Sequence, residues 1–201
     1  MPACAAGPLS TTSAGGPPAS TSAAAGRPGP PPSTGDESPS GSPPSTAALG
    51  EPPGAVRALT VPPDAQAATV VRHVDGDTLV VRGQGAGPLP AAPTRVRLLQ
   101  VDTPETGARQ ECFGPEAADL LAALLPVGAP VRVAADLDLL DRYGRSLLLL
   151  WDEAGRSVQE VLVAEGAATV LAVGRNARAL AELEAVQERA RHDRRGLWGA
   201  C

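Results

Sequence analysis

Four residues in two short stretches have the right types and spacing to hold a metal ion and to activate water. Asp77 follows an Asp-Gly step, and Asp102, Thr103 and Glu105 lie together around Pro104. A hard divalent cation such as calcium prefers several oxygen ligands, which aspartate side chains and a backbone carbonyl can supply. Because Pro104 fixes a bend, Asp102 and Glu105 can face one pocket instead of opposite sides of a strand. The pattern therefore favours calcium over zinc, with a carboxylate base beside the ion.

The elements around these residues indicate an α+β fold. Alternating or β-branched stretches predict five strands that form a barrel, over residues 68–73, 78–82, 94–101, 129–135 and 146–151. The Asp-Gly step between the first two strands is typical of a hairpin turn. Capping signals and helical spacing predict helices over residues 114–125, 157–165 and 176–191. Strands followed by segregated helices are typical of α+β proteins, and they place Asp77 in a turn and Asp102 at a strand end.

Composition divides the chain into two parts. Residues 1–64 consist almost wholly of Ala, Gly, Pro, Ser and Thr, so they have few apolar groups to offset the entropy of ordering. We expect this segment to be a disordered tether. Residues 65–201 carry nearly all the Val and Leu and are long enough for one hydrophobic core. We expect them to form a single domain, and the protein to be a monomer.

The charge balance excludes binding to nucleic acid through a global basic face. The chain has 17 basic residues, all arginines, against 22 acidic ones, and its net charge is −5. Non-specific nucleic-acid binders draw most of their affinity from phosphate neutralisation over a basic surface. Any phosphate contact in this chain must therefore be local, through individually placed arginines.

Three cysteines provide information on the cellular compartment in which the protein works. Cys112 and Cys201 both lie in the predicted domain, and an end-of-chain cysteine has no obvious packing role. We expect these two to pair, which would imply an oxidising compartment, although two unrelated thiols are the alternative. No segment is long and apolar enough to span a bilayer, and no signal peptide is visible at the start.

Cys4 leaves two readings open. Followed by small residues and a long polar segment, it resembles the first residue of a mature bacterial lipoprotein, which would make it a lipid anchor. That reading requires a start codon upstream of the sequence given, and a plain disordered tail is the other. In either case we expect an extracellular or surface-tethered protein.

Three separated motifs resemble those of the staphylococcal nuclease (thermonuclease) family. They are Val74-Asp75-Gly76-Asp77-Thr78, then Arg97 through Thr106 with the sequence RLLQVDTPET, then Asp141-Arg142-Tyr143-Gly144-Arg145. Their order and spacing match, and the similarity continues through Phe113-Gly114-Pro115 to Gly196-Leu197-Trp198. The resemblance thus covers essentially the whole predicted domain.

The resemblance implies a five-stranded OB-fold barrel with three helices, and calcium-dependent cleavage of DNA and RNA that leaves 3′-phosphate ends. Residue by residue, Asp77 and Asp102 match the calcium carboxylates, and Thr103 matches the residue whose carbonyl also binds the ion. Glu105 matches the general base or the group that positions the attacking water. Arg97 and Arg145 match the arginines that bind the scissile phosphate.

The resemblance weakens where the family binds the substrate. Its platform includes two tyrosines just after the second helix, and alignment on Gly166 puts Ala172 and Gly174 there; Tyr143 remains at its matching position. Because base stacking contributes roughly 1–3 kcal/mol per base, the family's affinity and base preference do not carry over. The acidic residues Asp136, Asp138 and Asp141 are interpreted as part of a solvated turn and not as a second metal site.

Two functions remain open on the sequence. The favoured one is a calcium-dependent endonuclease of thermonuclease type. The alternative is a degenerate, catalytically weak module that binds nucleic acid or protein. Such modules typically lose acidic and arginine site positions, whereas those positions are all present in this chain.

Overall fold

The computed structural model describes residues 58–201, which lie in one compact unit. Five strands form a closed barrel in the order β1-β2-β3-β6-β5. They are β1 (Gln66–His73), β2 (Thr78–Gly83), β3 (Pro93–Leu98), β5 (Pro130–Ala134) and β6 (Ser146–Trp151). Only β3 and β6 pair in parallel; the other neighbours are antiparallel. The predicted barrel is therefore confirmed, with strand ends within two residues of those expected for four of its strands.

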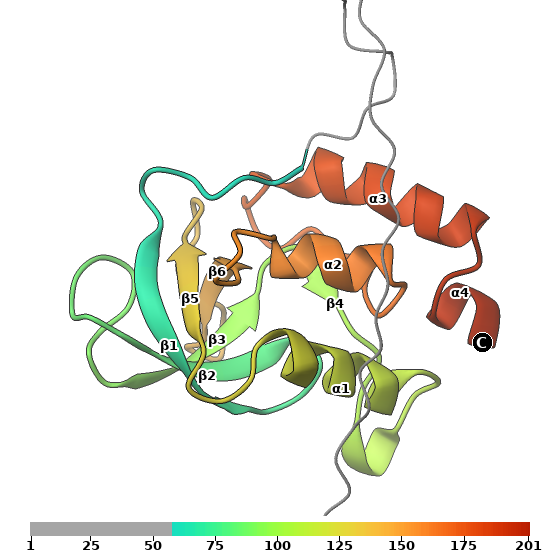
Figure 1. Ribbon diagram of the computed structural model, residues 1–201, viewed down its shortest axis with the longest axis horizontal. Helices are drawn as coiled ribbons and strands as arrows, with labels where there is room; N and C mark the ends of the chain where they lie inside the picture. The colour runs from blue at the N-terminus through green and yellow to red at the C-terminus, as the bar shows by residue number, and fades with distance from the viewer. Residues whose placement is uncertain (1–57) are drawn as a thin grey trace, which may run out of the picture. The chain divides into compact units, whose positions relative to one another are not determined.

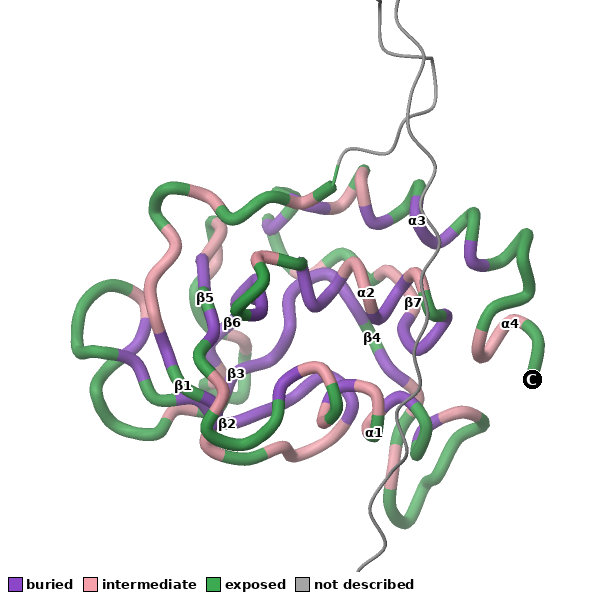
Figure 2. Tube along the Cα trace, in the orientation of Figure 1, coloured by how far each residue is buried: buried purple, intermediate pink, exposed green. Residues whose placement is uncertain are grey.

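The longer helices lie beside the barrel (Figure 1). They are α1 (Gly114–Leu124), α2 (Val158–Ala164) and α3 (Leu180–His192), followed by the single turn α4 (Leu197–Ala200). Pro115 opens α1, and the Ser157 hydroxyl accepts a hydrogen bond from the Glu160 N–H at the start of α2. Buried positions gather on the barrel strands and on the inner sides of these helices (Figure 2). The α+β class with three helices is confirmed.

The predicted third strand is wrong at its end. Instead of running to residue 101, β3 stops at Leu98, and the short strand β4 (Val101–Asp102) pairs with β7 (Thr169–Val170). The break falls at Gln100, whose φ is +64° and whose buried side chain accepts a hydrogen bond from the Ala179 N–H. The chain thus leaves the barrel at Leu99 and turns Asp102 towards the helical side.

The last long helix begins later than expected. It starts at Leu180 and not at Asn176, because residues 176–178 bind an acidic turn instead of forming helix. The Asn176 side chain exchanges two hydrogen bonds with the Asp138 backbone, and Asp136 accepts from the Ala177 and Arg178 N–H groups. The acidic residues that we interpreted as a solvated turn therefore hold the segment before α3.

The chain before β1 also contacts the domain. The Leu59 N–H donates to Glu160, and its carbonyl accepts from the Trp151 indole at 2.7 Å. Asp64 forms an ion pair with Arg178. Part of the segment expected to be a tether up to residue 64 thus packs on the domain; the rest of that expected tether, with Cys4, lies outside the described residues.

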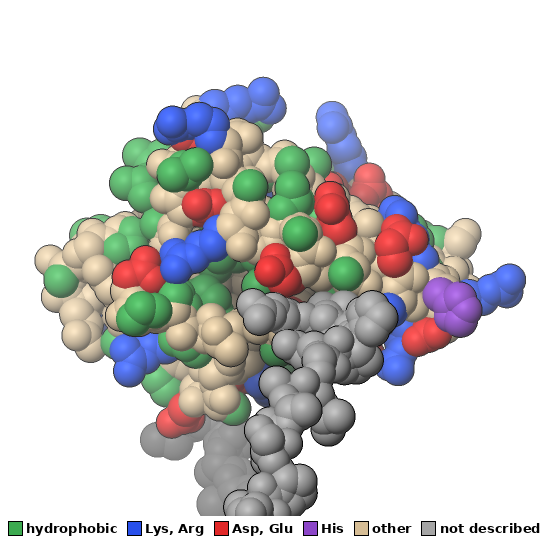
Figure 3. Space-filling model, turned by 90° about the horizontal axis from the view of Figure 1, so that it is seen from above, with side chains coloured by type: hydrophobic (Ala, Val, Ile, Leu, Met, Phe, Trp, Pro, Cys, Tyr) green, Lys and Arg blue, Asp and Glu red, His purple; other side chains and the backbone are tan. Residues whose placement is uncertain are grey.

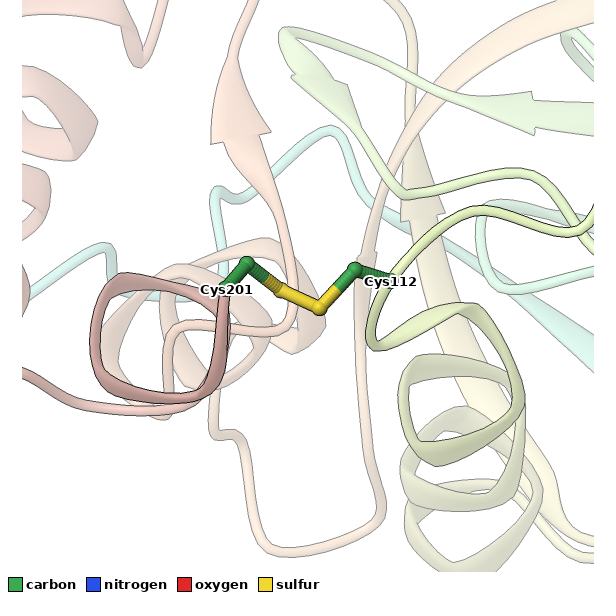
Figure 4. Close-up of a disulfide and its surroundings, with 2 residues drawn as sticks. All are labelled: Cys112 and Cys201. Carbon is green, nitrogen blue, oxygen red and sulfur yellow. A yellow bond between two sulfur atoms is a disulfide. The ribbon is translucent and has the colours of Figure 1, made fainter.

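A disulfide joins Cys112, just before α1, to Cys201 at the end of α4, with Cα atoms 6.0 Å apart (Figure 4). These are the two cysteines that we expected to pair. The bond closes 89 residues of chain, which include β5, β6, α2 and α3. It fixes the C-terminal turn against the start of α1.

Candidate functional site

Asp77 lies at the centre of the candidate site, in the turn between β1 and β2. It is buried, and its Oδ2 accepts from the Thr103 N–H at 3.1 Å and faces Arg97 Nη1 at 2.9 Å. The turn can approach Thr103 because residue 76 is glycine: a Cβ there would lie 2.6 Å from Thr103 Oγ1. Burial raises the pKa of Asp77 to about 6, against the opposing effects of Arg97 and the Thr103 N–H.

Arg97, on β3, joins the two aspartates that we expected to bind calcium. Its Nη2 donates to Asp102 Oδ1 at 2.6 Å, while Nη1 faces Asp77 and also donates to the Val101 carbonyl at 2.6 Å. The guanidinium is buried, with only 8% of the residue exposed. The arginine expected to bind phosphate is thus hydrogen-bonded to protein acceptors on several sides.

The candidate site contains carboxylate and carbonyl oxygens, the ligand types that calcium prefers. Two carboxylates face one cation, the Arg97 guanidinium, so they converge on a common position where positive charge is favoured. The Asp102 side chain is 54% exposed, so this carboxylate can be reached from solvent, whereas the Arg97 and Asp77 side chains are buried. Within residues 58–201 no three His, Cys, Asp or Glu side chains gather into a metal cluster. A calcium ion would therefore rely on these two carboxylates and on neutral oxygens such as the Thr103 carbonyl.

Arg145 is held beside this group by the turn before β6. Its Nε donates to Asp141 Oδ2 at 2.6 Å, its N–H donates to Asp141 Oδ1 at 2.9 Å, and its Nη1 reaches Thr78 Oγ1 at 3.4 Å. The pKa of Asp141 lies below its ordinary value; burial acts to raise it, but the hydrogen bonds from Arg145 and from the Tyr143 N–H outweigh that effect. Asp141 therefore fixes the Arg145 side chain as an ionised partner.

Sequence reasoning missed this role of Asp141, which we had placed in a solvated turn. The available signal was its spacing of four residues from Arg145 across a glycine.

Glu105 differs from the other site residues in its hydrogen bonds. It is exposed, and among the described residues its carboxylate has no hydrogen bond or ion pair. Its backbone, by contrast, is bonded on both sides to Glu111. The structure thus joins five of the expected residues in one hydrogen-bonded network: Asp77, Arg97, Asp102, Thr103 and Arg145. Glu105 follows Asp102 and Thr103 closely in the sequence, but its side chain is not part of this network.

An open cleft of about 570 Å³ lies over the two arginines. Tyr143 lines it, 68% exposed, with the guanidinium carbons of Arg142 and Arg145 at 4.7 and 5.5 Å from its ring centroid. Apolar side chains form much of the remaining wall: Leu137, Leu139, Leu140, Leu147, Leu171 and Val173. These leucines were not identified as site residues from the sequence, although three of them alternate with acids in residues 136–141.

Gly174, which the resemblance aligns with a tyrosine of the family, also lines this cleft. Its φ is +60°, and a Cβ would lie 2.4 Å from the Asp138 carboxylate, so a larger residue does not fit the present loop. A single aromatic ring, that of Tyr143, therefore lines the cleft within the described part of the chain.

One face of the molecule matches the mixed charge of the sequence. The face that carries α3 has acidic and basic side chains side by side and no continuous basic area (Figure 3). No helix among residues 58–201 is both long and apolar enough to cross a membrane.

The amino-acid sequence is similar to those of known proteins. The family model described as "Staphylococcal nuclease homologue" matches residues 95–200. A thermonuclease of Staphylococcus hyicus is 31% identical over 133 residues, which cover 64% of this chain and 73% of that protein. Endonuclease YncB of Bacillus subtilis is 32% identical over 65% of this chain and 60% of its own length.

An uncharacterized endonuclease of Escherichia coli O157:H7 is also 32% identical, over 64% of this chain and 74% of that protein. The family match spans more than half of the chain and includes most of β3, both arginines and the acidic stretch around Pro104. The chain belongs to the staphylococcal nuclease family.

Proposed function

We propose that this protein is a calcium-dependent endonuclease that hydrolyses phosphodiester bonds of DNA and RNA. The observation that carries the proposal is the convergence of Asp77 and Asp102 on Arg97, with Arg145 fixed beside them at the floor of an open cleft. Two carboxylates next to two arginines suit a bound cation together with a phosphate. The nuclease names of the relatives support the same reaction class.

In this proposal Asp77, Asp102 and the Thr103 carbonyl hold the calcium. The ion supplies a Lewis acid for a phosphoryl oxygen of the substrate. Burial of Asp77 and its bond to the Thr103 N–H keep the ligand group rigid, while the exposed Asp102 leaves one side open to substrate.

The arginines bind the scissile phosphate. A guanidinium holds two phosphate oxygens at once and stays protonated, so it stabilises the charge that develops in the transition state. Arg145 lines the cleft, with its Nε held by Asp141 and its Nη1 reaching Thr78 Oγ1. Arg97 must give up part of its present bonding to Asp102 to contact phosphate, since its Nη2 donates to that carboxylate.

Glu105 orients the attacking water and takes its proton. Its carboxylate is exposed and has no partner among residues 58–201, so it is available to water. The product then leaves with a 3′-phosphate, as in the family.

We also propose that the protein works outside the cytoplasm. Cys112 and Cys201 are both exposed and form a disulfide, and such bonds persist in oxidising compartments.

The test is release of acid-soluble nucleotides from single-stranded DNA by the full chain, with calcium or with chelator. We expect cleavage only with calcium, and losses of about 100-fold or more in Glu105→Gln and Arg145→Ala. Glu153→Gln and Arg82→Ala are matched controls at exposed positions outside the cleft, and they should retain activity. A folded, calcium-binding protein that does not cleave would instead support a nucleic-acid-binding module.

A further inference from the structure

The loop that carries Glu105 is closed by Glu111. The Glu111 N–H donates to the Glu105 carbonyl at 2.9 Å, and the Glu105 N–H donates to Glu111 Oε2 at 3.0 Å. One residue thus satisfies both backbone groups of Glu105. A third contact comes from α1, because a Cβ on Gly114 would lie 2.4 Å from the Glu105 carbonyl oxygen. The backbone of Glu105 is therefore placed by residues 111 and 114, which flank Cys112.

Few other polar contacts hold this loop. Across residues 104–112, the hydrogen bonds found in the described chain stay within the loop or at its junction with α1. Residues 107–112 are all exposed, and the only regular structure is one 3-10 turn, Gly107–Arg109. Besides its junction with α1, the loop is tied to the C-terminal turn α4 by the bond from Cys112 to Cys201 (Figure 4).

The other end of this link is well anchored. Cys201 ends α4, where the Leu197 N–H donates to the Gly166 carbonyl at 2.9 Å. Gly166 packs so closely that a Cβ would lie 2.2 Å from the Arg195 carbonyl oxygen. The disulfide therefore connects the Glu105 loop to a turn that is fixed on the end of α2.

We propose that Glu111 and the Cys112–Cys201 disulfide are positioning elements for Glu105, so that reduction of the disulfide lowers turnover. The proposal rests on the role given above to Glu105. A dithiol reductant donates two electrons and two protons to the disulfide, yields two cysteine thiols and becomes a disulfide itself. Both cysteines are exposed and accessible to it. Reduction leaves the proposed catalytic residues chemically unchanged and removes only the covalent support of the loop.

The first experiment compares the full chain with its Cys112→Ser/Cys201→Ser variant, both in a Cys4→Ser background that prevents thiol exchange. Activity on single-stranded DNA with calcium is measured at a temperature where circular dichroism shows both proteins folded. We expect kcat to fall roughly ten-fold with KM little changed, because displacement of a catalytic group by about 1 Å can cost up to about 100-fold. Dithiothreitol should reproduce the loss in the parent, and reoxidation should reverse it.

Amide hydrogen exchange supplies a readout that does not depend on activity. Residues 105–113 should exchange faster after reduction, while β2, β3 and β6 keep their protection. An unchanged kcat together with unchanged exchange in the loop would overturn the proposal. A parent protein without nuclease activity would overturn the proposed function instead, and the exchange measurement would still decide whether the disulfide holds the loop.

Glu111 is tested by its own pair of variants. Glu111→Gln keeps an oxygen that can accept from the Glu105 N–H, whereas Glu111→Ala removes it. We expect Glu111→Ala to lose kcat roughly ten-fold and Glu111→Gln to retain most of it. Glu153→Ala, at an exposed position away from the loop, is the control. Equal activity in both Glu111 variants and the parent would exclude a positioning role for this residue.

Discussion

Two turns with the same Asp–Arg bonding flank β6, and only one of them lies at the cleft. Asp141 and Arg145 enclose the turn before the strand, while Asp152 and Arg156 enclose the turn after it. In both, the aspartate accepts from the backbone and the side chain of the arginine four residues on. Because the turns lie at opposite ends of one strand, only the first brings its arginine to the cleft.

This duplication provides a matched test of Asp141. Asp141→Asn keeps an oxygen for the backbone donors but loses the charged partner of Arg145 Nε, so the guanidinium is held less firmly. We expect kcat/KM on single-stranded DNA to fall roughly ten-fold, with little change in thermal stability. Asp152→Asn removes the equivalent pair at the far end and should leave activity intact. Equal activity in both variants would mean that Asp141 does not position Arg145.

The raised pKa of Asp77 predicts an unusual pH dependence. Its folded pKa is about 6 against an ordinary value of 3.8, so between these values the folded state binds more protons than the unfolded state. The contribution of Asp77 to stability is therefore largest below pH 4, and it decreases as the pH rises to about 6. Relative to Asp77→Asn, the parent should lose on the order of 2 kcal/mol of unfolding free energy between pH 4 and pH 7 in chelator.

Urea unfolding of the two proteins at both pH values measures this difference. Asp119→Asn, at an exposed carboxylate on α1, is the control: it keeps Asp77, so its difference in unfolding free energy from the parent should be the same at both pH values. Saturating calcium should oppose the trend in the parent alone, because the ion binds the ionised carboxylate and stabilises the folded state. A difference between parent and Asp77→Asn that does not change with pH would contradict the prediction.

At the scale of elements, local sequence signals predicted most strands and helices. They failed where contacts between distant residues determine where an element begins or ends. Strand alternation, the Asp-Gly turn and the Ser157 cap are local, and those elements form where expected. The end of β3 is not local, because Gln100 leaves the strand to bind Ala179 across 79 residues. The start of α3 likewise depends on Asp136 and Asp138, about forty residues earlier.

The site was predictable to the same extent. Resemblance to the family identified the residues that the structure brings together, including Asp77, Asp102 and Arg145. It did not indicate that Arg97 bridges the two carboxylates, since a side-chain conformation depends on the packing around it. Nor did it show the leucine wall of the cleft, because all of these apolar residues except Leu147 lie in loops outside the strands and helices.

The loop before α3 supports one prediction at this scale. Gly174→Ala adds a methyl group at a position with positive φ and drives it against the carboxylate of Asp138, which pairs with Arg175. Gly128 also has positive φ, but nothing lies within 4 Å of its added Cβ. We expect Gly128→Ala to cost about 1 kcal/mol of unfolding free energy and Gly174→Ala about 2 kcal/mol or more. Equal losses in urea unfolding would show that the Asp138 contact adds nothing.

For the whole molecule, the segment before β1 belongs to the folded unit. Composition alone places the domain boundary at residue 65, because Pro-rich sequence continues almost to that point. The described structure instead has Leu59 packed against the core, with its backbone bonded to Trp151 and Glu160. Trp151 is the largest fully buried side chain, so this segment covers the core where β6 ends.

A chain that begins at residue 65 should therefore be less stable than one that begins at residue 58. Removal of residues 58–64 leaves the Trp151 indole N–H without the Leu59 carbonyl and eliminates the ion pair between Asp64 and Arg178. An unpaired buried donor costs about 1–3 kcal/mol, which urea unfolding monitored by tryptophan fluorescence can measure. In the longer chain, Leu59→Ala keeps the backbone bonds and loses only apolar contact, so it separates the two effects. Equal stability of the two chains would show that the domain begins at residue 65 and that the contacts of Leu59 do not contribute to its stability.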